Sequence, residues 1–398
     1  MLRISDIAAR AGVSSATVSF VLNDRHAEER ISEKTRNKVL EAAEELGYRS
    51  NQMARAMRTG NTLMLGMLGG DTGEEPVGKM VAGALQAADE RGYTLKILRD
   101  SLGGSAQQVI RRCSELRLMG VIALHLPPQT LSELRSEAGR YGYPLVLMDA
   151  RSEMSDMPQV VSDDEAGIEA GVAHLVGLGH TKIAFISGEE LSTLSALREN
   201  AFGRAMQRRG LALPESYVAR GDYHLHEPSF EAAHSLLGLP EEERPTAIFC
   251  SGDLIALATL QVAHELQLSV PRDLSVVGFA NFRVSAFATP QLTTVEQPFA
   301  EMGRAAVNLL LEILEQKEGT KTGHTANHGQ KQSVIPRGGL REKAEDKQIS
   351  SSVDKESGTL LEAHSSTRTT RSIYKLPTQL IERASTAPPH LAASSRSL

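Results

Sequence analysis

Residues 7–23 of the chain read IAARAGVSSATVSFVLN. This stretch predicts two short helices joined by a tight turn, because Gly12 stands where the first helix would stop and Ser14 where the second would be capped. Small Ala8 allows the helices to approach closely, and Val18 is the expected buried contact of the second helix. This pattern favours a helix-turn-helix, which lays its second helix in the major groove of DNA. An ordinary αα-hairpin is the alternative.

Residues 4–60 continue this helical pattern in short segments. Apolar positions recur on one face of each segment, as at Val39, Ala43 and Leu46. Positions suited to helix N-caps and helix stops alternate along the segment: Ser5, Ser14, Ser32 and Asn51 are candidate N-caps, and Gly12, Gly47 and Gly60 are candidate stops.

Residues 62–316 change to short apolar runs separated by longer amphipathic stretches. The runs predict strands, and the stretches 77–91 and 166–178 predict helices. Strands that alternate with helices imply parallel sheets covered on both faces, with a ligand cleft at the carboxyl ends of the strands. The pattern alone fits either one large doubly wound sheet or two smaller ones. The expected strands are 63–68, 94–98, 120–124, 145–148, 182–186, 246–250 and 274–279.

Residues 317–373 have a different composition, rich in Ser, Thr, Lys, Gly and His and without Trp, Phe or Tyr. Such a segment cannot bury enough apolar surface to offset its ordering entropy, so it is predicted to be a disordered insert. Order is expected to return at Tyr374, with a final strand within 374–390 and a flexible tail over 391–398. The alternative is that the folded chain ends near residue 316 and that everything after it is an unfolded tail.

Bulk composition indicates a soluble globular protein of two or more domains: 398 residues, 41% hydrophobic and 23% charged, with a net charge of −6. Residues 1–60 hold ten Lys/Arg against eight Asp/Glu, and this mildly basic segment permits DNA binding. Cys113 and Cys250 stand far apart, which fits a reducing cytoplasm better than a disulfide framework or a metal cluster. Neither a signal peptide nor a membrane-spanning apolar run is expected.

Enzyme motifs fit this sequence poorly. The run GLGHTK at 177–182 lacks the third Gly of a dinucleotide fingerprint and precedes a strand instead of following one. There is no Gly-x-Ser-x-Gly elbow. We therefore expect no catalytic residues, no metal and no cofactor. The spacing of a zinc-binding helix is missing from His224, His226, His234 and His264.

Several further motifs occur in an order that resembles the lactose-repressor (LacI/GalR) family over nearly the whole chain. The resemblance implies an α/β protein with a helix-turn-helix headpiece at 1–50, a hinge helix and linker at 51–61, and a two-lobed, periplasmic-binding-protein-like effector and dimerisation domain at 62–316. The strand within 374–390 would complete that domain. The motifs are LGYR at 46–49, NQMARAMRTG at 51–60, GVAHLVGLGH at 171–180, PRDLSVVGF at 271–279, PQLTTV at 290–295 and LPTQLI at 376–381.

The function implied by this resemblance is sequence-specific repression of transcription, with operator affinity modulated by a small polar, sugar-like effector. The implied partners are a pseudo-palindromic double-stranded DNA operator and a second copy of the chain, in the cytoplasm and associated with the nucleoid. An alternative function is a small-molecule binding module whose specific DNA binding is weakened or lost.

The resemblance also implies roles for residues of the second helix. Ser15, Ala16 and Phe20 match positions that read base edges. Phe20 departs from the family, which usually has Arg there, so it can offer only apolar contact, for example to a thymine methyl group. Alternatively, Phe20 folds back into the headpiece core. The positions that match phosphate contacts are Ser14, Thr17, Ser19 and Asn23.

In the hinge, the resemblance assigns Ala54 and Met57 to the minor groove, with Met57 in place of the Leu that the family wedges between base pairs. The alternative is that Met53, Ala54 and Met57 are buried against the headpiece or the partner's hinge. A hinge this short is not helical alone in water, so it is expected to fold only on DNA.

For the effector, the resemblance assigns Arg198 and Asp253 to ligand hydroxyls, together with Asn281 and Asp71. A planar donor fork and a carboxylate acceptor suit paired hydroxyl groups. The alternative is an interlobe salt bridge with no ligand. The motifs depart from the family here, because Gly252 replaces its Asn and residues 280–281 are Ala-Asn where it has Asp-Asp. One residue of the pair at 163–164 is expected to cap the helix that begins near Ala166.

Overall fold

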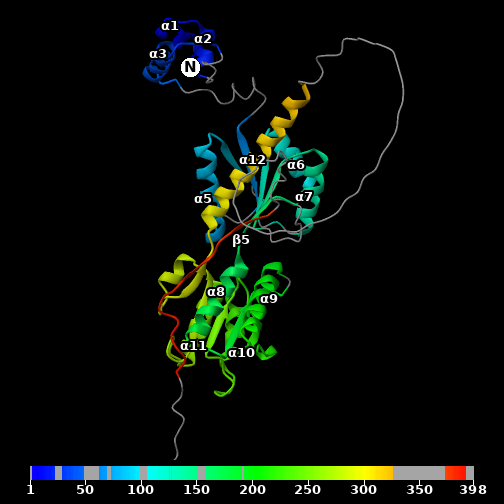
Figure 1. Cartoon of the computed structure of the whole chain (residues 1–398), viewed down its shortest axis with the longest axis vertical. Coiled ribbons are helices and arrows are strands. Elements are labelled where there is room, and N and C mark those ends of the chain that lie inside the picture. The colour runs from blue at the N-terminus through cyan, green and yellow to red at the C-terminus, as the bar shows by residue number, and fades with distance from the viewer. Residues whose placement is uncertain are drawn as a thin grey trace, which may run out of the picture.

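A computed structural model describes residues 2–22, 29–48, 62–69, 73–98, 105–124, 126, 128–149, 157–190, 192–325 and 373–390. Figure 1 shows a small helical unit at the amino terminus and two α/β lobes, one containing α5, α6 and α7 and the other containing α8 to α11.

The headpiece is built from α1 (Ile4–Ala11), α2 (Ser15–Leu22) and α3 (Glu33–Glu45). Gly12 ends α1 in the left-handed conformation at φ 66°, as the sequence predicts. The helices share one small core, so the predicted helix-turn-helix is confirmed. Its fully or nearly fully buried side chains are Ile7, Ala8, Val18, Val21, Val39, Ala42 and Ala43.

The caps of these helices follow the sequence in two cases and depart from it in one. The amide of Thr17 donates to Ser14 Oγ over 3.0 Å, and Ser32 caps α3 through the amide of Thr35. The prediction of Ser5 as an N-cap is wrong, because α1 begins at Ile4 and the amide of Arg3 donates to the Asp6 carboxylate over 2.8 Å. The acidic side chain in the first turn performs the capping that the hydroxyl was expected to supply.

Within the described residues the strands form two six-stranded sheets, so the alternative of one large sheet is wrong. The N-terminal lobe has the order β11-β5-β4-β3-β1-β2, and all its described pairings are parallel. Its strands β3 and β4 are buried along their whole length, as expected for central strands covered on both faces. The bounds are β1 (Met64–Leu68), β2 (Thr94–Leu98), β3 (Val121–Leu124), β4 (Leu145–Met148), β5 (Gln159–Ser162) and β11 (Ile373–Leu376).

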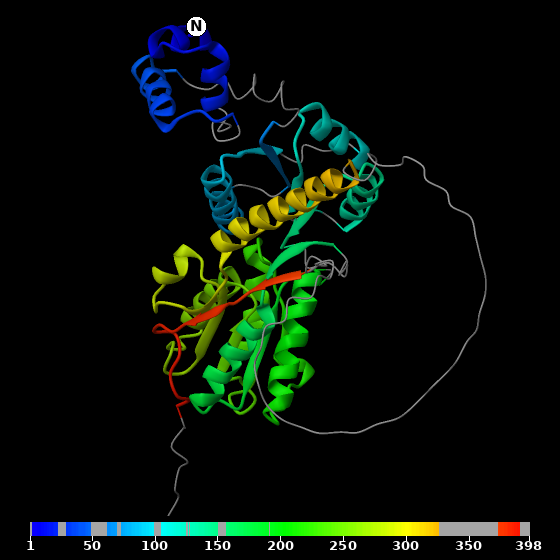
Figure 2. The same ribbon diagram turned by 45° about the horizontal axis from the view of Figure 1, so that its top comes forward.

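Helices cover both faces of this sheet. On one face α5 (Glu75–Glu90) and α12 (Phe299–Thr325) pack against it, and on the other face lie α6 (Ala106–Glu115) and α7 (Pro128–Arg140). Figure 2 shows α12 crossing the N-terminal lobe beside α5. These two helices touch backbone to backbone, because a Cβ on Gly83 would lie 1.9 Å from the carbonyl oxygen of Ala300. A Cβ on Gly303 would lie equally close to the Met80 carbonyl, at 1.9 Å.

The C-terminal lobe repeats this architecture with the strand order β12-β10-β9-β8-β6-β7. Its pairings are parallel except that β12 runs antiparallel to β10. One face is covered by α8 and α9 and the other by α10 and α11. The bounds are α8 (Asp164–Gly177), β6 (Ile183–Ser187), α9 (Thr193–Arg208), β7 (Val218–Arg220), α10 (His226–Leu237), β8 (Ala247–Cys250), α11 (Asp253–Glu265), β9 (Ser275–Ala280), β10 (Thr293–Glu296) and β12 (Gln379–Ile381), with 3-10 turns η1 (Glu215–Tyr217) and η2 (Arg283–Ala286).

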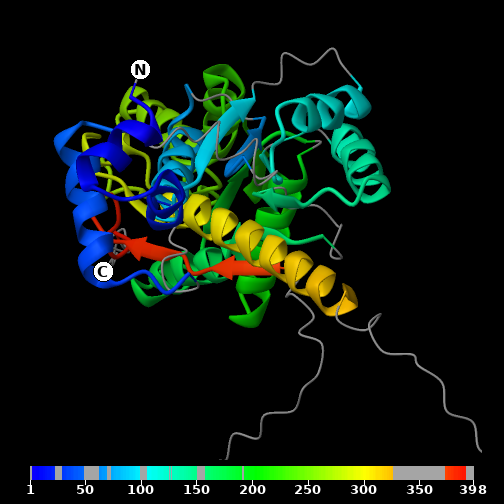
Figure 3. The same ribbon diagram turned by 90° about the horizontal axis from the view of Figure 1, so that it is seen from above.

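The described chain passes between the lobes at three places: from β5 to α8, from β10 to α12, and from β11 to β12. Figure 3 shows β11 and β12 as two successive red arrows beside α12. The expected final strand is therefore two strands, one completing each sheet. This arrangement excludes the alternative in which the folded chain ends near residue 316.

The end of α12 also differs from the sequence analysis. The helix continues past Gln316 to Thr325, and Lys317 Nζ donates to the carbonyl oxygen of Gly142 over 2.7 Å. A low apolar content predicts little burial, but it does not stop a helix that a packed segment has already nucleated. The remainder of the predicted insert, residues 326–372, lies outside the described residues.

The final described residues, after β12, are held against the C-terminal lobe. Ser385 is fully buried, and its hydroxyl donates to the Val276 carbonyl over 2.6 Å and accepts from the Thr293 amide over 2.8 Å. His180, also buried, has Nε2 at 2.9 Å from the carbonyl oxygen of Ala387 and Nδ1 at 2.8 Å from the Thr246 hydroxyl. The segment 382–387 therefore bridges β9 and β10.

Candidate functional site

The amino end of α2 faces solvent. Ser14, Ser15 and Ala16 are exposed, whereas Thr17 and Ser19 are half-buried. The hydroxyls of Ser14 and Thr17 lie 2.8 Å apart and share a hydrogen bond, which fixes the first turn of the helix. An exposed, capped helix start suits contact with an anion such as a phosphate.

Phe20 is half-buried on α2, between buried Val18 and Val21. Its ring is thus neither fully exposed for base contact nor enclosed as the core valines are. Three other expected DNA-contacting residues lie outside the described residues: Asn23, Ala54 and Met57.

Arg198 lies in the second turn of α9 and is 3% exposed. Its Nε donates to Asp164 Oδ2 over 2.7 Å, Nη1 to the Ser251 carbonyl over 2.6 Å, and Nη2 to Gln297 Oε1 over 3.0 Å. The guanidinium also lies 4.0 Å from the centroid of the Phe279 ring. These contacts hold Arg198 in one orientation and leave one hydrogen on each terminal nitrogen for a further partner.

The carboxylate of Asp164, which pairs with Arg198, also accepts hydrogen bonds from neighbouring side chains. Asp164 Oδ1 accepts from the Ser162 hydroxyl over 2.6 Å and from Gln297 Nε2 over 3.3 Å. Its neighbour Asp163 caps α8 by accepting from the Ala166 amide over 3.2 Å, as the sequence predicts. Asp164 therefore pairs with Arg198, and Asp163 caps α8.

Asp253 is fully buried at the start of α11. Oδ1 accepts from the Thr294 hydroxyl over 2.5 Å, and Oδ2 accepts from the Phe282 amide over 2.6 Å and the Ser285 hydroxyl over 2.7 Å. Burial raises the pKa of the Asp253 carboxyl above its ordinary value, and these three donors oppose the rise. The carboxyl thus ties α11 to η2 and β10.

Of the remaining two candidate effector residues, Asn281 bonds other partners than Arg198 and Asp253. Asn281 donates through Nδ2 to Glu296 over 2.9 Å and accepts at Oδ1 from Arg383 over 2.7 Å, so both ends of its amide join the C-terminal segment to β10. Asp71 lies outside the described residues.

Three hydroxyl groups near Arg198 were missed by the sequence analysis. Among the described residues, the oxygens of Tyr223, Ser195 and Ser251 are buried without a hydrogen-bond partner. A lone Tyr or Ser belongs to no recognisable sequence motif. These residues could have been found only from their place after a strand: residues 223 and 251 follow β7 and β8, at the sheet edge where ligands of parallel sheets bind.

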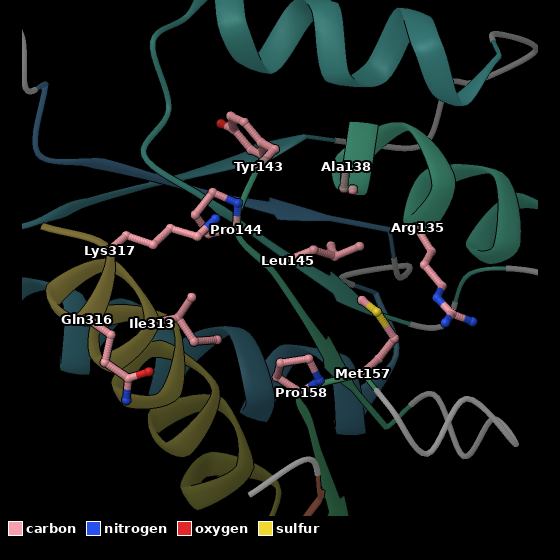
Figure 4. A pocket seen from close by; sticks show the side chains of 11 residues that line it. Arg135, Ala138, Tyr143, Pro144, Leu145, Met157, Pro158, Ile313, Gln316 and Lys317 are labelled. Atoms are coloured by element: carbon pink, nitrogen blue, oxygen red, sulfur yellow. The ribbon is translucent and has the colours of Figure 1, made fainter. Parts of the chain in front are cut away.

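A cavity of about 510 Å³ lies elsewhere, in the N-terminal lobe between α7 and residues 313–317 of α12. Figure 4 shows Leu145, Met157, Pro158 and Ile313 around it, with Arg135 and Lys317 on opposite sides. No residue of the Arg198 cluster lines it. A smaller hollow of about 170 Å³ beside β5 and β11 does include Ser162 and Asp164 in its lining.

The described residues hold neither a membrane-spanning helix nor a cluster of metal ligands. No helix there is long and apolar enough to span a membrane. The same residues contain no group of three or more His, Cys, Asp or Glu side chains placed to hold a metal ion.

Comparisons with known proteins agree on one family. Residues 3–51 match the family described as bacterial regulatory proteins, lacI family, and residues 172–338 match a periplasmic binding protein-like domain. The HTH-type transcriptional repressor PurR of Escherichia coli O139:H28 is 33% identical over 323 residues, covering 80% of this chain and 92% of that protein. PurR of Aliivibrio fischeri strain MJ11 is 31% identical over 322 residues, covering 80% and 93%.

Solved structures share the fold. The lac repressor dimer bound to operator and the anti-inducer ONPF has a TM-score of 0.69 at 24% identity, covering 97% of this chain and 99% of that one. The complex of the transcriptional regulator CelR with cellobiose has a TM-score of 0.61 at 23% identity, covering 97% and 100%. With its helix-turn-helix, its two lobes and these relatives, the chain belongs to the lacI family of bacterial regulatory proteins, DNA-binding transcriptional repressors with a ligand-binding domain.

Proposed function

We propose that this protein is a cytoplasmic homodimeric repressor that binds a pseudo-palindromic operator through α2 and responds to a small polar effector held between its lobes. The observation that carries the proposal is the exposed amino end of α2 on a well-packed headpiece. Ser15 and Ala16 are exposed there, next to the Ser14 cap. In a helix-turn-helix these are the positions that meet base edges.

The proposed roles come from the family resemblance, and the chemistry of the side chains supports them. Ser14, Thr17 and Ser19 offer hydroxyls for phosphate oxygens, whereas Ala16 and Phe20 offer only apolar contact. Asn23 for a phosphate, and Ala54 with Met57 for the minor groove, complete the proposed interface from the family resemblance.

A second copy of the chain is the proposed partner for one apolar face of the C-terminal lobe. Four large apolar side chains are exposed on neighbouring elements: Leu225 (62%), Leu254 (42%), Val284 (42%) and Phe287 (75%). Asp253 bonds Phe282 and Ser285, so the start of α11 lies against η2, and Leu254 and Val284 adjoin that contact. Exposed apolar groups gathered in this way mark interaction surfaces. Sedimentation of Phe287→Asp as a monomer would support this dimer face, and an unchanged dimer would exclude it.

The effector is proposed to bind at the carboxyl ends of the C-terminal lobe strands. Arg198 keeps two hydrogens for a ligand, and partnerless hydroxyls surround it. The fixed guanidinium would orient ligand oxygens, whereas Asp253 would act through the η2 and β10 segments that it holds.

The test is selection of DNA from a random pool by the full-length dimer, with and without extract of small molecules from cells. We expect an enriched pseudo-palindrome whose affinity falls by about 10³ or more between roughly 50 and 200 mM salt, because several phosphate contacts release counterions. The extract should change the affinity for the selected site.

Matched variants locate the interface. Ala16→Glu places a negative charge on the exposed start of α2 and should abolish selection, whereas Asn37→Asp adds the same charge on exposed α3 and should not. Enrichment of no sequence by the wild-type protein would favour a small-molecule binding module that has lost specific DNA binding.

A further inference from the structure

The cavity of about 510 Å³ in the N-terminal lobe lies at one edge of the lobe's sheet. Leu145 is the first residue of β4, and Met157 and Pro158 directly precede β5, so the cavity lies at the amino ends of these strands. The described strands of this sheet are parallel, so β1, the first strand after the headpiece, begins at the same edge. The cavity is therefore separate from the Arg198 cluster in the other lobe.

The wall of the cavity is mostly apolar and is held in place. The hydroxyl of Tyr143 donates to the Leu118 carbonyl over 2.6 Å, which fixes the loop before β4. Lys317 Nζ donates to the Gly142 carbonyl over 2.7 Å, which joins α12 to the same loop. Small-molecule sites typically have apolar walls and volumes of about 300–1,000 Å³, a range that includes this cavity. Beside the Tyr143 ring, the apolar lining consists of Ala138, Pro144, Leu145, Met157, Pro158 and Ile313.

The charged side chains of the lining have one sign. Figure 4 shows Arg135 of α7 and Lys317 of α12 on opposite sides of the apolar wall. Among the described residues that line the cavity, none is acidic. Two cations beside an apolar wall complement a molecule that has an apolar body and an anionic end. A cation with the same apolar body would instead meet like charge.

We propose that this cavity is a second ligand site and that it binds a small amphipathic carboxylate. The apolar body of the ligand lies against Leu145, Met157 and Ile313, and its carboxylate accepts hydrogen bonds from Arg135 and Lys317. A ligand in this place contacts α7, the starts of β4 and β5, and α12 at once. The site offers the protein a ligand input that is independent of the effector proposed for the C-terminal lobe.

The ligand class is tested by isothermal titration of the full-length protein with octanoate, below the concentration at which octanoate forms micelles. The compounds 1-octanol and octylammonium carry the same tail and are the matched probes. We expect saturable binding of octanoate about tenfold or more tighter than that of 1-octanol, because a hydrogen bond to a charged group contributes about that factor. Octylammonium should bind more weakly than 1-octanol. Equal affinity for the three probes, or no saturable binding of octanoate, overturns the proposal.

The location is tested by Gly139→Leu. Gly139 lines the cavity, and a Cβ built on it meets nothing within 4 Å, so the leucine side chain can enter the cavity without a clash. The midpoint of thermal unfolding should stay the same or rise, since leucine favours a helix over glycine. Octanoate affinity should fall by about tenfold or more, because the ligand and the new side chain compete for the same space.

The matched control is Gly203→Leu in α9, where a Cβ also meets nothing within 4 Å. This variant should bind octanoate as the wild type does. An octanoate affinity of Gly139→Leu equal to that of the wild type would show that the probe binds elsewhere and would overturn the assignment of the cavity.

The role of charge is tested by the double substitution Arg135→Gln with Lys317→Gln. Octanoate affinity should fall by about tenfold, and the weaker binding of 1-octanol should be unchanged. Arg140→Gln is the control, because Arg140 is an exposed cation of the same helix that does not line the cavity. A parallel loss of both probes in the double variant would overturn the choice of a carboxylate.

Two other occupants of the cavity predict different results. A variant in which residues 326–372 are replaced by a Gly/Ser linker should bind octanoate as the wild type does, whereas binding by this variant alone would assign the cavity to that segment of the chain. Octanoate affinity that falls as the protein concentration rises would assign it to a second copy. Either result overturns the proposal. None of these titrations involves DNA, so the ligand site and the proposed repressor function are tested separately.

Discussion

Arg198 and Asp164 form a buried ion pair in the C-terminal lobe. Removing one member of a buried ion pair leaves the other uncompensated, so Arg198→Ala should lower the free energy of unfolding by about 3–5 kcal/mol. The double substitution Arg198→Met with Asp164→Leu should recover a large part of this loss. Denaturant unfolding of both variants measures the difference. A single variant as stable as the wild type would show that the pair is hydrated and not buried.

His180 gives the C-terminal segment a dependence on pH. Burial lowers the pKa of His180 below its ordinary value, against the opposing effect of the Ala387 carbonyl. The unfolded chain therefore binds a proton first, at about 6.5. The stability that neutral His180 contributes is complete above this value and is lost as the pH falls through it towards the folded pKa.

The measurement is the midpoint of unfolding from pH 7.5 down to about 5.5, across the unfolded pKa of histidine. Wild type should lose stability faster than His180→Asn over this window. His264→Asn, at an exposed position on α11, is the matched control. If the midpoints of wild type and His180→Asn fell in parallel with pH, His180 would not contribute to the loss of stability in acid.

For single residues, caps and turns could be predicted from the sequence, whereas contacts between side chains far apart in the sequence could not. Gly12 and Ser14 were assigned correctly because a turn and a cap depend on a few adjacent residues. The partner of Arg198 lies 34 positions away on another helix, and nothing in either segment alone indicates the contact. Tyr223 was missed for the same reason.

At the scale of elements, the close approach of α5 and α12 makes a sharp prediction. Gly303→Ala would place a Cβ 1.9 Å from the Met80 carbonyl oxygen and force two backbones apart. We expect a loss of about 3 kcal/mol or more. Gly203→Ala in α9 meets nothing within 4 Å and should gain up to about 1 kcal/mol from helix propensity. Equal effects of the two substitutions in denaturant unfolding would contradict the backbone contact.

The elements themselves were largely predictable from apolar runs. The seven expected strands correspond to β1, β2, β3, β4, β6, β8 and β9. Strand β7 was not recognised, because it has three residues and its place is set by a neighbouring strand. The single strand expected within 374–390 is two strands, β11 and β12. The helix α12 was expected to end before residue 317, but it continues to Thr325. The polar composition of residues 317–325 indicates that they are not buried, but it does not indicate whether they are helical.

On the scale of the whole molecule, the C-terminal segment should be indispensable although a long insert precedes it. Deleting 373–398 removes β11 and β12 and uncovers β10 as an edge, so the midpoint of unfolding should fall and the C-terminal lobe should become sensitive to protease. Replacing 326–372 by a Gly/Ser linker of about 20 residues should change stability by less than about 1 kcal/mol, since loop closure depends on length only logarithmically. A harmless deletion, or unfolding caused by the linker, would refute this role.

The position of β11 and β12 at the end of the chain also sets an order in time during synthesis. The headpiece is complete by residue 48, whereas each sheet acquires its final strand only after residue 373 has been made. At about 5–20 residues per second, a nascent chain spends on the order of 20–70 s with a finished DNA-reading unit and an unfinished regulatory body. During that interval the nascent chain has a complete headpiece, but its effector-binding lobes still lack their final strands.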